Sequence, residues 1–182
     1  MRTDTPAGDF GWQAPDFTLS DPSGQTFNLS DHLGGKGVLV MFLCNHCPYV
    51  KAIGDRLAED MAELQAAAIT VVAIMSNDYQ SYPSDSPDLM PAFAAQYGWT
   101  FPYLVDEDQS VARAFGAVCT PDFFGFNSDG ALQYRGRLDD KGRGDPAGRR
   151  RELVEAMLKV AESGQGPRDQ VPSMGCSIKW RP

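Results

Sequence analysis

Long apolar runs are scarce in this chain of 182 residues, and this excludes a membrane-spanning helix. The longest run extends only from Val38 to Cys44, whereas a spanning helix needs about 20 apolar residues. The segment from Met1 to Gly8 contains an acidic residue, a proline and a glycine, where a secretory signal would be apolar. We therefore expect a cytoplasmic protein.

The chain also has few lysine and arginine residues compared with acidic residues. Lysine and arginine total 16 against 24 acidic residues, which gives a net charge of -8 at pH 7. Because such a surface repels phosphate groups, we expect neither a nucleic-acid partner nor an anionic membrane surface. Glycine-rich dinucleotide and P-loop fingerprints are missing as well, so we predict no organic cofactor.

The chain has few cysteines, but two of them are separated by only two residues. Four cysteines, Cys44, Cys47, Cys119 and Cys176, are too few for a small secreted disulfide scaffold. The spacing of the first two favours redox chemistry or a metal. Cys44, His46 and Cys47 offer three zinc ligands, but adjacent side chains at a helix start point apart, and a structural site needs a fourth ligand. We predict no metal site.

Hydrophobic patterning predicts a strand, a helix and a second strand in succession. Residues 38–43 are apolar on both faces, which is typical of a parallel strand covered on both sides. From Cys47 to Leu64 the apolar positions follow helical spacing, and we expect Arg56 and Asp60 to pair on the exposed side of this helix. A second buried strand at 69–75 then requires a right-handed parallel crossover.

Shorter elements and turns complete the chain. The remaining predicted elements are an edge hairpin over 15–27, a helix over 88–97, a strand over 101–105, a helix over 109–115, a hairpin around 127–130 and a last helix ending at Gly164. We expect Asp88 to cap the first of these helices and Asp145, followed by Pro146, to cap the last. No repeat or long linker divides the chain, so we predict one domain over 1–164 and an extended C-terminal tail over 165–182 that packs on it.

The motif Cys44-Asn45-His46-Cys47 lies where the first predicted strand ends and the long helix begins. A sulfur at a helix N-terminus faces unpaired backbone N–H groups and the positive end of the helix dipole, and both favour thiolate over thiol. His46 can add positive charge or a hydrogen bond beside the Cys44 sulfur, and we count it among the catalytic residues. We therefore expect a nucleophilic, more exposed Cys44 and a more buried Cys47 that attacks the mixed disulfide.

Placed in this way, the motif gives the chain a family resemblance. From about Ala14 to Gly164 the chain resembles thioredoxin-fold proteins of the alkyl hydroperoxide reductase/thiol-specific antioxidant (redoxin) group. The segments that carry the resemblance are 14–19, 44–47, Phe-Pro-Tyr-Leu-Val-Asp at 101–106, Cys-Thr-Pro-Asp-Phe-Phe at 119–124 and 126–130. It implies a three-layer α/β/α thioredoxin fold with a central mixed sheet, an extra N-terminal hairpin and a peroxiredoxin-like insertion before the cis-proline hairpin.

The resemblance also implies a function and a site. Cys44 would attack and Cys47 resolve in a thiol–disulfide oxidoreductase, with Pro121 as the cis-proline that faces both sulfurs. We expect Asn45 and Thr120 to contact substrate, because a cis bond at Thr120-Pro121 presents the Thr120 backbone to an extended chain. The expected partners are disulfide-containing proteins or small thiols and an unidentified reductant, and we expect a monomer or homodimer.

Other functions stay open. A peroxiredoxin-like thiol peroxidase would use Cys47 or Cys44, but the pattern P-x-x-x-T-x-x-C, counted back from Cys47, puts Cys44 where the peroxide-orienting threonine would stand. A metal-binding or inactive thioredoxin-fold module is a third interpretation. Cys119 and Cys176 are candidate auxiliary thiols, each with a plain packing role as its alternative.

Overall fold

The computed structural model describes residues 1–182. The strands are β1 (Arg2–Asp4), β2 (Thr18–Ser20), β3 (Thr26–Asn28), β4 (Val38–Phe42), β5 (Thr70–Met75), β6 (Tyr103–Val105), β7 (Cys119–Thr120), β8 (Asp122–Phe126), β9 (Leu132–Tyr134) and β10 (Met174–Ser177). The α-helices are α1 (Pro48–Ala66), α2 (Met90–Tyr97), α3 (Ser110–Phe115) and α4 (Glu152–Ser163), and three short 3-10 helices are η1 (Leu29–His32), η2 (Pro83–Asp85) and η3 (Pro87–Leu89).

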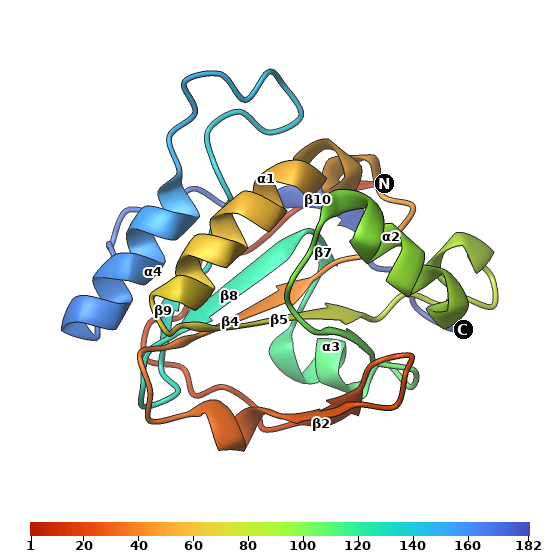
Figure 1. The fold of residues 1–182 in the computed structure, drawn as a ribbon, viewed down its shortest axis with the longest axis horizontal. Helices are drawn as coiled ribbons and strands as arrows, with labels where there is room; N and C mark the ends of the chain where they lie inside the picture. The colour runs from red at the N-terminus through yellow and green to blue at the C-terminus, as the bar shows by residue number, and fades with distance from the viewer.

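A seven-stranded mixed sheet forms the middle layer, in the order β3-β2-β6-β5-β4-β8-β9. Strands β4, β5 and β6 are parallel, and β8 returns antiparallel to β4. Helices α1, α2 and α4 cover one face of the sheet, whereas α3 and the N-terminal segment cover the other (Figure 1). The three-layer α/β/α thioredoxin fold predicted from the sequence is confirmed.

Two apolar cores follow from the alternation of side chains along the central strands. In β4, Leu39 and Met41 belong to the core beneath α1 and α4, whereas Val40 and Phe42 belong to the core that includes α3. A slip of one residue would exchange these two sets. The register of β4 is therefore strongly specified, and with it the position of the motif that follows.

Two helix starts differ from the prediction. Asp88 lies in η3, and Leu89 takes the N-cap position of α2. Asp145 accepts a hydrogen bond from the backbone N–H of Ala147, 2.9 Å away, within a turn. Helix α4 begins only at Glu152. Aspartate is common both in turns and at helix N-caps, so the residue type alone did not show whether Asp88 and Asp145 would form a turn or cap a helix.

The predicted pair of Arg56 and Asp60 on the exposed side of α1 is wrong. Both side chains are buried, and both bind residues that precede or begin α4. Arg56 donates to the two carboxylate oxygens of Asp139 at 3.0 and 2.9 Å, and Asp60 accepts from Arg149 and Arg151. Helical periodicity could not reveal this network, because its partners come from a distant part of the sequence.

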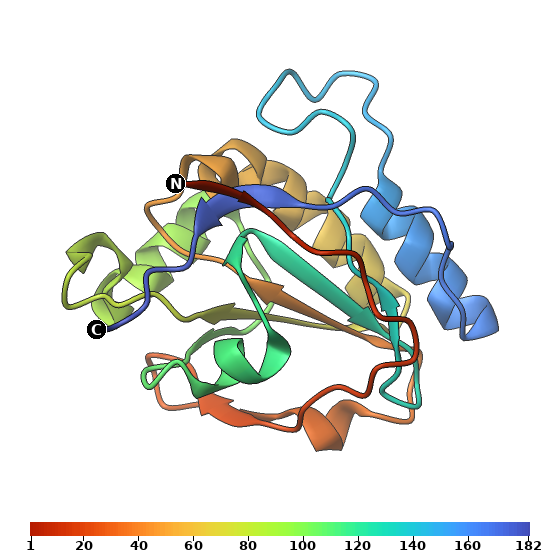
Figure 2. The same cartoon turned by 180° about the vertical axis from the view of Figure 1, so that it is seen from behind.

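The two ends of the chain run side by side (Figure 2). Strand β10 pairs antiparallel with β7 on one edge and with β1 on the other. The approach to β7 requires glycine, because a Cβ on Gly175 would lie 1.9 Å from the Thr120 carbonyl oxygen. Strand β1 was not expected from the sequence, since three residues with charged ends carry no hydrophobic period.

No helix of this structure combines the length and the apolar character needed to cross a membrane.

Asp60→Asn should lower the free energy of unfolding by about 3 kcal/mol, because it leaves buried arginine charge without its carboxylate partner. The neighbouring Glu59→Gln is the matched control. Its side chain is 67% exposed and lies 3.3 Å from Arg149, so its loss should cost at most about 1 kcal/mol. Urea unfolding followed by circular dichroism measures both. Equal losses in the two variants would contradict the buried network.

Candidate active site

The motif cysteines lie at the junction of β4 and α1. Cys47 is the N-cap residue of α1 and has an extended backbone. Pro48 follows in the first turn of the helix, where its missing N–H is tolerated because first-turn N–H groups have no intrahelical partner. The strand-to-helix placement therefore follows from the sequence pattern.

Neither cysteine is accessible. Cys44 and Cys47 each have 0% relative exposure, so the expectation of a more exposed Cys44 is wrong. Two covers explain the burial, and of these the sequence predicted only that the C-terminal tail packs on the domain. The loop that carries Asp85 lies next to Cys44, and the C-terminal strand β10 packs against the α1 side of the site.

Thr120 contacts both sulfurs. Its Oγ1 lies 3.3 Å from Cys44 Sγ, and its carbonyl oxygen accepts a hydrogen bond from Cys47 Sγ at 3.2 Å. The bond between Thr120 and Pro121 is cis, as the family resemblance implies. The end of β7 therefore lies directly against the motif.

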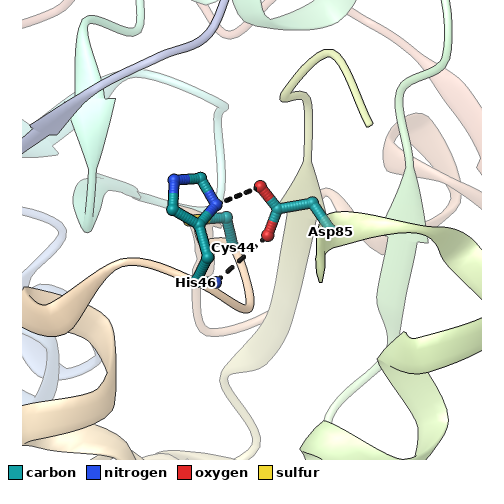
Figure 3. A group of neighbouring side chains, drawn as sticks. All are labelled: Cys44, His46 and Asp85. Atoms are coloured by element: carbon teal, nitrogen blue, oxygen red, sulfur yellow. Dashed lines mark hydrogen bonds and ion pairs between the residues drawn. The ribbon is translucent and has the colours of Figure 1, made fainter. Parts of the chain in front are cut away.

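Asp85 organises the other side of the motif (Figure 3). One carboxylate oxygen accepts the backbone N–H groups of Asn45 and His46 at 2.7 and 3.2 Å. The other lies 2.5 Å from His46 Nδ1 and accepts a hydrogen bond from Asn77 at 2.9 Å. Burial of Asp85 favours a higher pKa, but the hydrogen bonds from His46 and Asn77 outweigh it and lower the pKa overall.

Sequence reasoning missed Asp85 altogether. It lies in a polar loop in which nothing local distinguishes it from Asp78 or Asp88. His46 directs its ring at Asp85 and stacks on Tyr82 with 5.5 Å between ring centroids. The hydrogen bond that we expected beside Cys44 is therefore made to a carboxylate that the sequence did not point out.

Asn45 is also held by the protein itself. Its amide oxygen accepts a hydrogen bond from the Tyr103 hydroxyl at 2.9 Å, and its amide nitrogen donates to the Ser84 carbonyl at 3.1 Å. The residue is only 5% exposed. Asn45 thus ties the motif to the loop before α2 and to β6, and its expected contact with substrate stays a prediction.

The surroundings distinguish the two thiols. The hydrogen bond from Cys44 lowers the pKa of Cys47 well below its usual value, with further hydrogen bonds from Cys176 and Thr120. The same bond with Cys47 raises the pKa of Cys44, and burial and the charge of Asp85 raise it further. Negative charge is thus favoured on Cys47, at the N-terminus of α1, and disfavoured on Cys44, beside a carboxylate.

The other two cysteines differ in position. Cys119 is buried, its Sγ lies 3.6 Å from the Pro121 carbonyl, and burial raises its pKa. Because neighbours on a strand point to opposite faces, Cys119 faces away from the sulfurs that Thr120 touches. Cys176 is half-buried, and burial and a hydrogen bond with Cys47 raise its pKa. Only Cys176 therefore joins the motif.

Cys44, His46 and Asp85 have donor atoms within 4.8 Å of one another, so we considered a metal. Asp85 already accepts four hydrogen bonds from the motif and Asn77, and a tetrahedral zinc site needs a fourth ligand. We assign the cluster to hydrogen bonding.

A pocket of about 390 Å³ opens beside Pro121. Tyr49, Phe123 and Met174 contribute apolar surface to its lining, and Arg143 lies over the Tyr49 ring at 5.2 Å. Such a pocket suits an apolar side chain next to the site.

Solved structures match nearly the whole chain. An uncharacterized conserved protein from Geobacillus kaustophilus is 39% identical with a TM-score of 0.92, covering 100% of this chain and 97% of that one. A hypothetical protein from Sinorhizobium meliloti is 38% identical with a TM-score of 0.91, covering 98% of both. A putative thiol:disulfide interchange protein DsbE from Chlorobium tepidum is 25% identical with a TM-score of 0.62, covering 85% of this chain and 99% of that one.

Curated relatives match a shorter part. Peroxiredoxin Bcp of Escherichia coli is 33% identical over 75% of this chain and 81% of its own length. Thiol-disulfide oxidoreductase ResA of Bacillus subtilis is 29% identical over 67% of this chain and 64% of its own length. The family model described as AhpC/TSA matches residues 10–135. The chain therefore belongs to the AhpC/TSA family.

Proposed function

We propose that the protein is a thiol–disulfide oxidoreductase that uses Cys44 and Cys47 as a dithiol/disulfide pair. The observation that carries this proposal is the contact of Thr120 with both sulfurs, through its hydroxyl on one and its carbonyl on the other. Relatives named ResA and DsbE, described as a thiol-disulfide oxidoreductase and a putative thiol:disulfide interchange protein, support it.

The chemistry needs a thiolate for the first attack. A thiolate attacks a substrate disulfide and forms a mixed disulfide, and a second thiol then attacks the enzyme sulfur, which leaves the pair oxidised and the substrate as two thiols. The resemblance gives the first role to Cys44. Because the surroundings favour negative charge on Cys47, we make Cys47 the first thiol of the pair to attack, and Cys44 the thiol that closes the internal disulfide.

The substrates in this proposal are disulfide-containing proteins or small disulfides. The apolar pocket beside Pro121 is the place where a side chain next to the substrate disulfide would bind. Residues 1–164 form the redox domain and residues 165–182 the tail that covers it. We place the reaction in the cytoplasm, where thiol pools supply electrons.

A thiol peroxidase of the peroxiredoxin type is the second candidate. The similarity to peroxiredoxin Bcp and the lowered pKa of Cys47 favour it, whereas Cys44 stands where a peroxide-orienting threonine would be needed. Thiol-dependent peroxide consumption that Cys47→Ser abolishes and Cys44→Ser retains would establish this activity instead.

Replacement of either motif cysteine should sharply slow turnover of insulin disulfides in the presence of dithiothreitol, because the Cys44–Cys47 disulfide can no longer form. Cys44→Ser should in addition accumulate a disulfide that contains Cys47, which peptide mapping after acid quenching detects. Cys119→Ser is the control and should retain wild-type turnover, since this thiol faces away from the pair. Full turnover by Cys44→Ser would contradict the proposal, and a mixed disulfide trapped only in Cys47→Ser would reverse the two roles.

Asp85→Asn should lower the pKa of Cys44 by about one unit, because it removes a carboxylate charge that opposes the thiolate. Ultraviolet absorbance of the thiolates, titrated against pH in a Cys47→Ser background, measures the shift. Asp88→Asn, an exposed aspartate three residues further along, is the matched control and should leave the titration unchanged. An identical Cys44 titration in both variants would show that Asp85 does not act on this sulfur.

A further inference from the structure

A third sulfur lies beside the buried pair. Cys176 stands opposite Thr120 in the ladder between β10 and β7, and Thr120 touches the sulfurs of Cys44 and Cys47. Directly opposite residues of an antiparallel pair have Cα atoms about 4.5–5.5 Å apart. Cys176 also packs against the apolar core that contains Cys44 and Cys47. Strand β10 therefore brings a thiol from the C-terminal tail to the motif.

Access to solvent separates Cys176 from the other cysteines. Cys44, Cys47 and Cys119 are buried, and Cys176 is partly exposed. A disulfide that arrives from solution therefore meets Cys176 before it can meet either sulfur of the motif.

The position of Cys176 is fixed by its neighbours. Gly175 lets the backbone of β10 lie against Thr120, and Ser173 donates a hydrogen bond to the Pro121 carbonyl at 2.8 Å. Ile178, two residues after the cysteine, is only 4% exposed and belongs to the core around α3. This thiol is therefore held in place by contacts on both sides of it.

The pocket beside Pro121 is bounded in part by β10, the strand that carries Cys176. Met174 contributes to its lining, and residues two apart on a strand project from the same face. Cys176 therefore projects from the same face of β10 as Met174, two residues away from the lining of the pocket.

We infer that Cys176 is a third catalytic thiol, through which a substrate disulfide exchanges electrons with the buried pair of Cys44 and Cys47. This inference rests on the proposed function and adds the route by which a covered pair reaches its substrate.

The exchange balances in three steps. Cys176 passes its proton to the Cys47 thiolate and attacks the substrate disulfide, and the first substrate thiolate leaves and takes that proton. Cys47 then attacks the sulfur of Cys176, and the second substrate thiolate leaves and takes the proton of Cys44. Cys44 finally attacks Cys47 and releases Cys176 as a thiolate. The dithiol has lost two electrons, the substrate has become two thiols, and Cys176 is regenerated.

Trapping in a Cys44→Ser variant tests the middle of this sequence. Without the closing thiol, treatment with oxidised glutathione should accumulate a disulfide between Cys47 and Cys176, which alkylation and peptide mapping identify. Glutathione found on Cys47 with Cys176 still free would overturn the inference.

The rate of oxidation supplies a second, independent readout. In Cys176→Ser, rapid-quench measurement with oxidised glutathione should show loss of the fast phase in which the Cys44–Cys47 disulfide forms. The equilibrium between this disulfide and glutathione should not change, because Cys176 is regenerated. Cys119→Ser is the matched control and should keep the fast phase. A wild-type rate in Cys176→Ser would overturn the relay and leave the proposed function intact, whereas a wild-type protein that never forms the Cys44–Cys47 disulfide would overturn the proposed function itself.

Discussion

The active-site architecture depends on one residue, Thr120, whose hydroxyl and carbonyl each contact one sulfur of the motif. Its backbone also pairs with β10, which in turn pairs with β1. The small three-stranded sheet is thereby joined to the end of β4, an interior strand of the large sheet. A change in the position of Thr120 would disturb its contacts with both sulfurs and with strand β10. The reactive pair and the strand that covers it are therefore coupled through this residue.

On the opposite side of the motif a buried charge sets the electrostatics. A carboxylate without solvent is costly unless hydrogen bonds replace its hydration, and Asp85 receives four of them. These bonds hold the loop over Cys44 and keep the carboxylate charged, as the lowered pKa of Asp85 indicates. That charge opposes a thiolate on Cys44, and the N-terminus of α1 favours one on Cys47. The division of roles between two neighbouring cysteines therefore comes from their surroundings rather than from their order in the chain.

Local patterns predicted the parts of the structure that local physics determines. The sequence predicted the buried strand β4, the apolar stripe of α1 and the junction between them, because each involves only neighbouring residues. The family resemblance predicted the cis bond before Pro121. Asp85, the partners of Arg56 and the pairing of β1 with β10 were not, because each depends on residues far apart in the sequence. The burial of Cys44 belongs to the second group, since the loop and strand that cover the site lie outside the motif.

Burial of a reactive pair leaves two routes to a substrate: the cover opens, or a thiol within the cover carries the exchange. Opening would separate β10 from both of its partner strands and withdraw Ile178 from the core, which alone costs about 1.5–3 kcal/mol. Exchange through Cys176 needs neither, because the half-buried thiol already packs against the core that contains Cys47 and stands opposite Thr120. The same contacts that close the site thus favour exchange through Cys176 over opening of the cover.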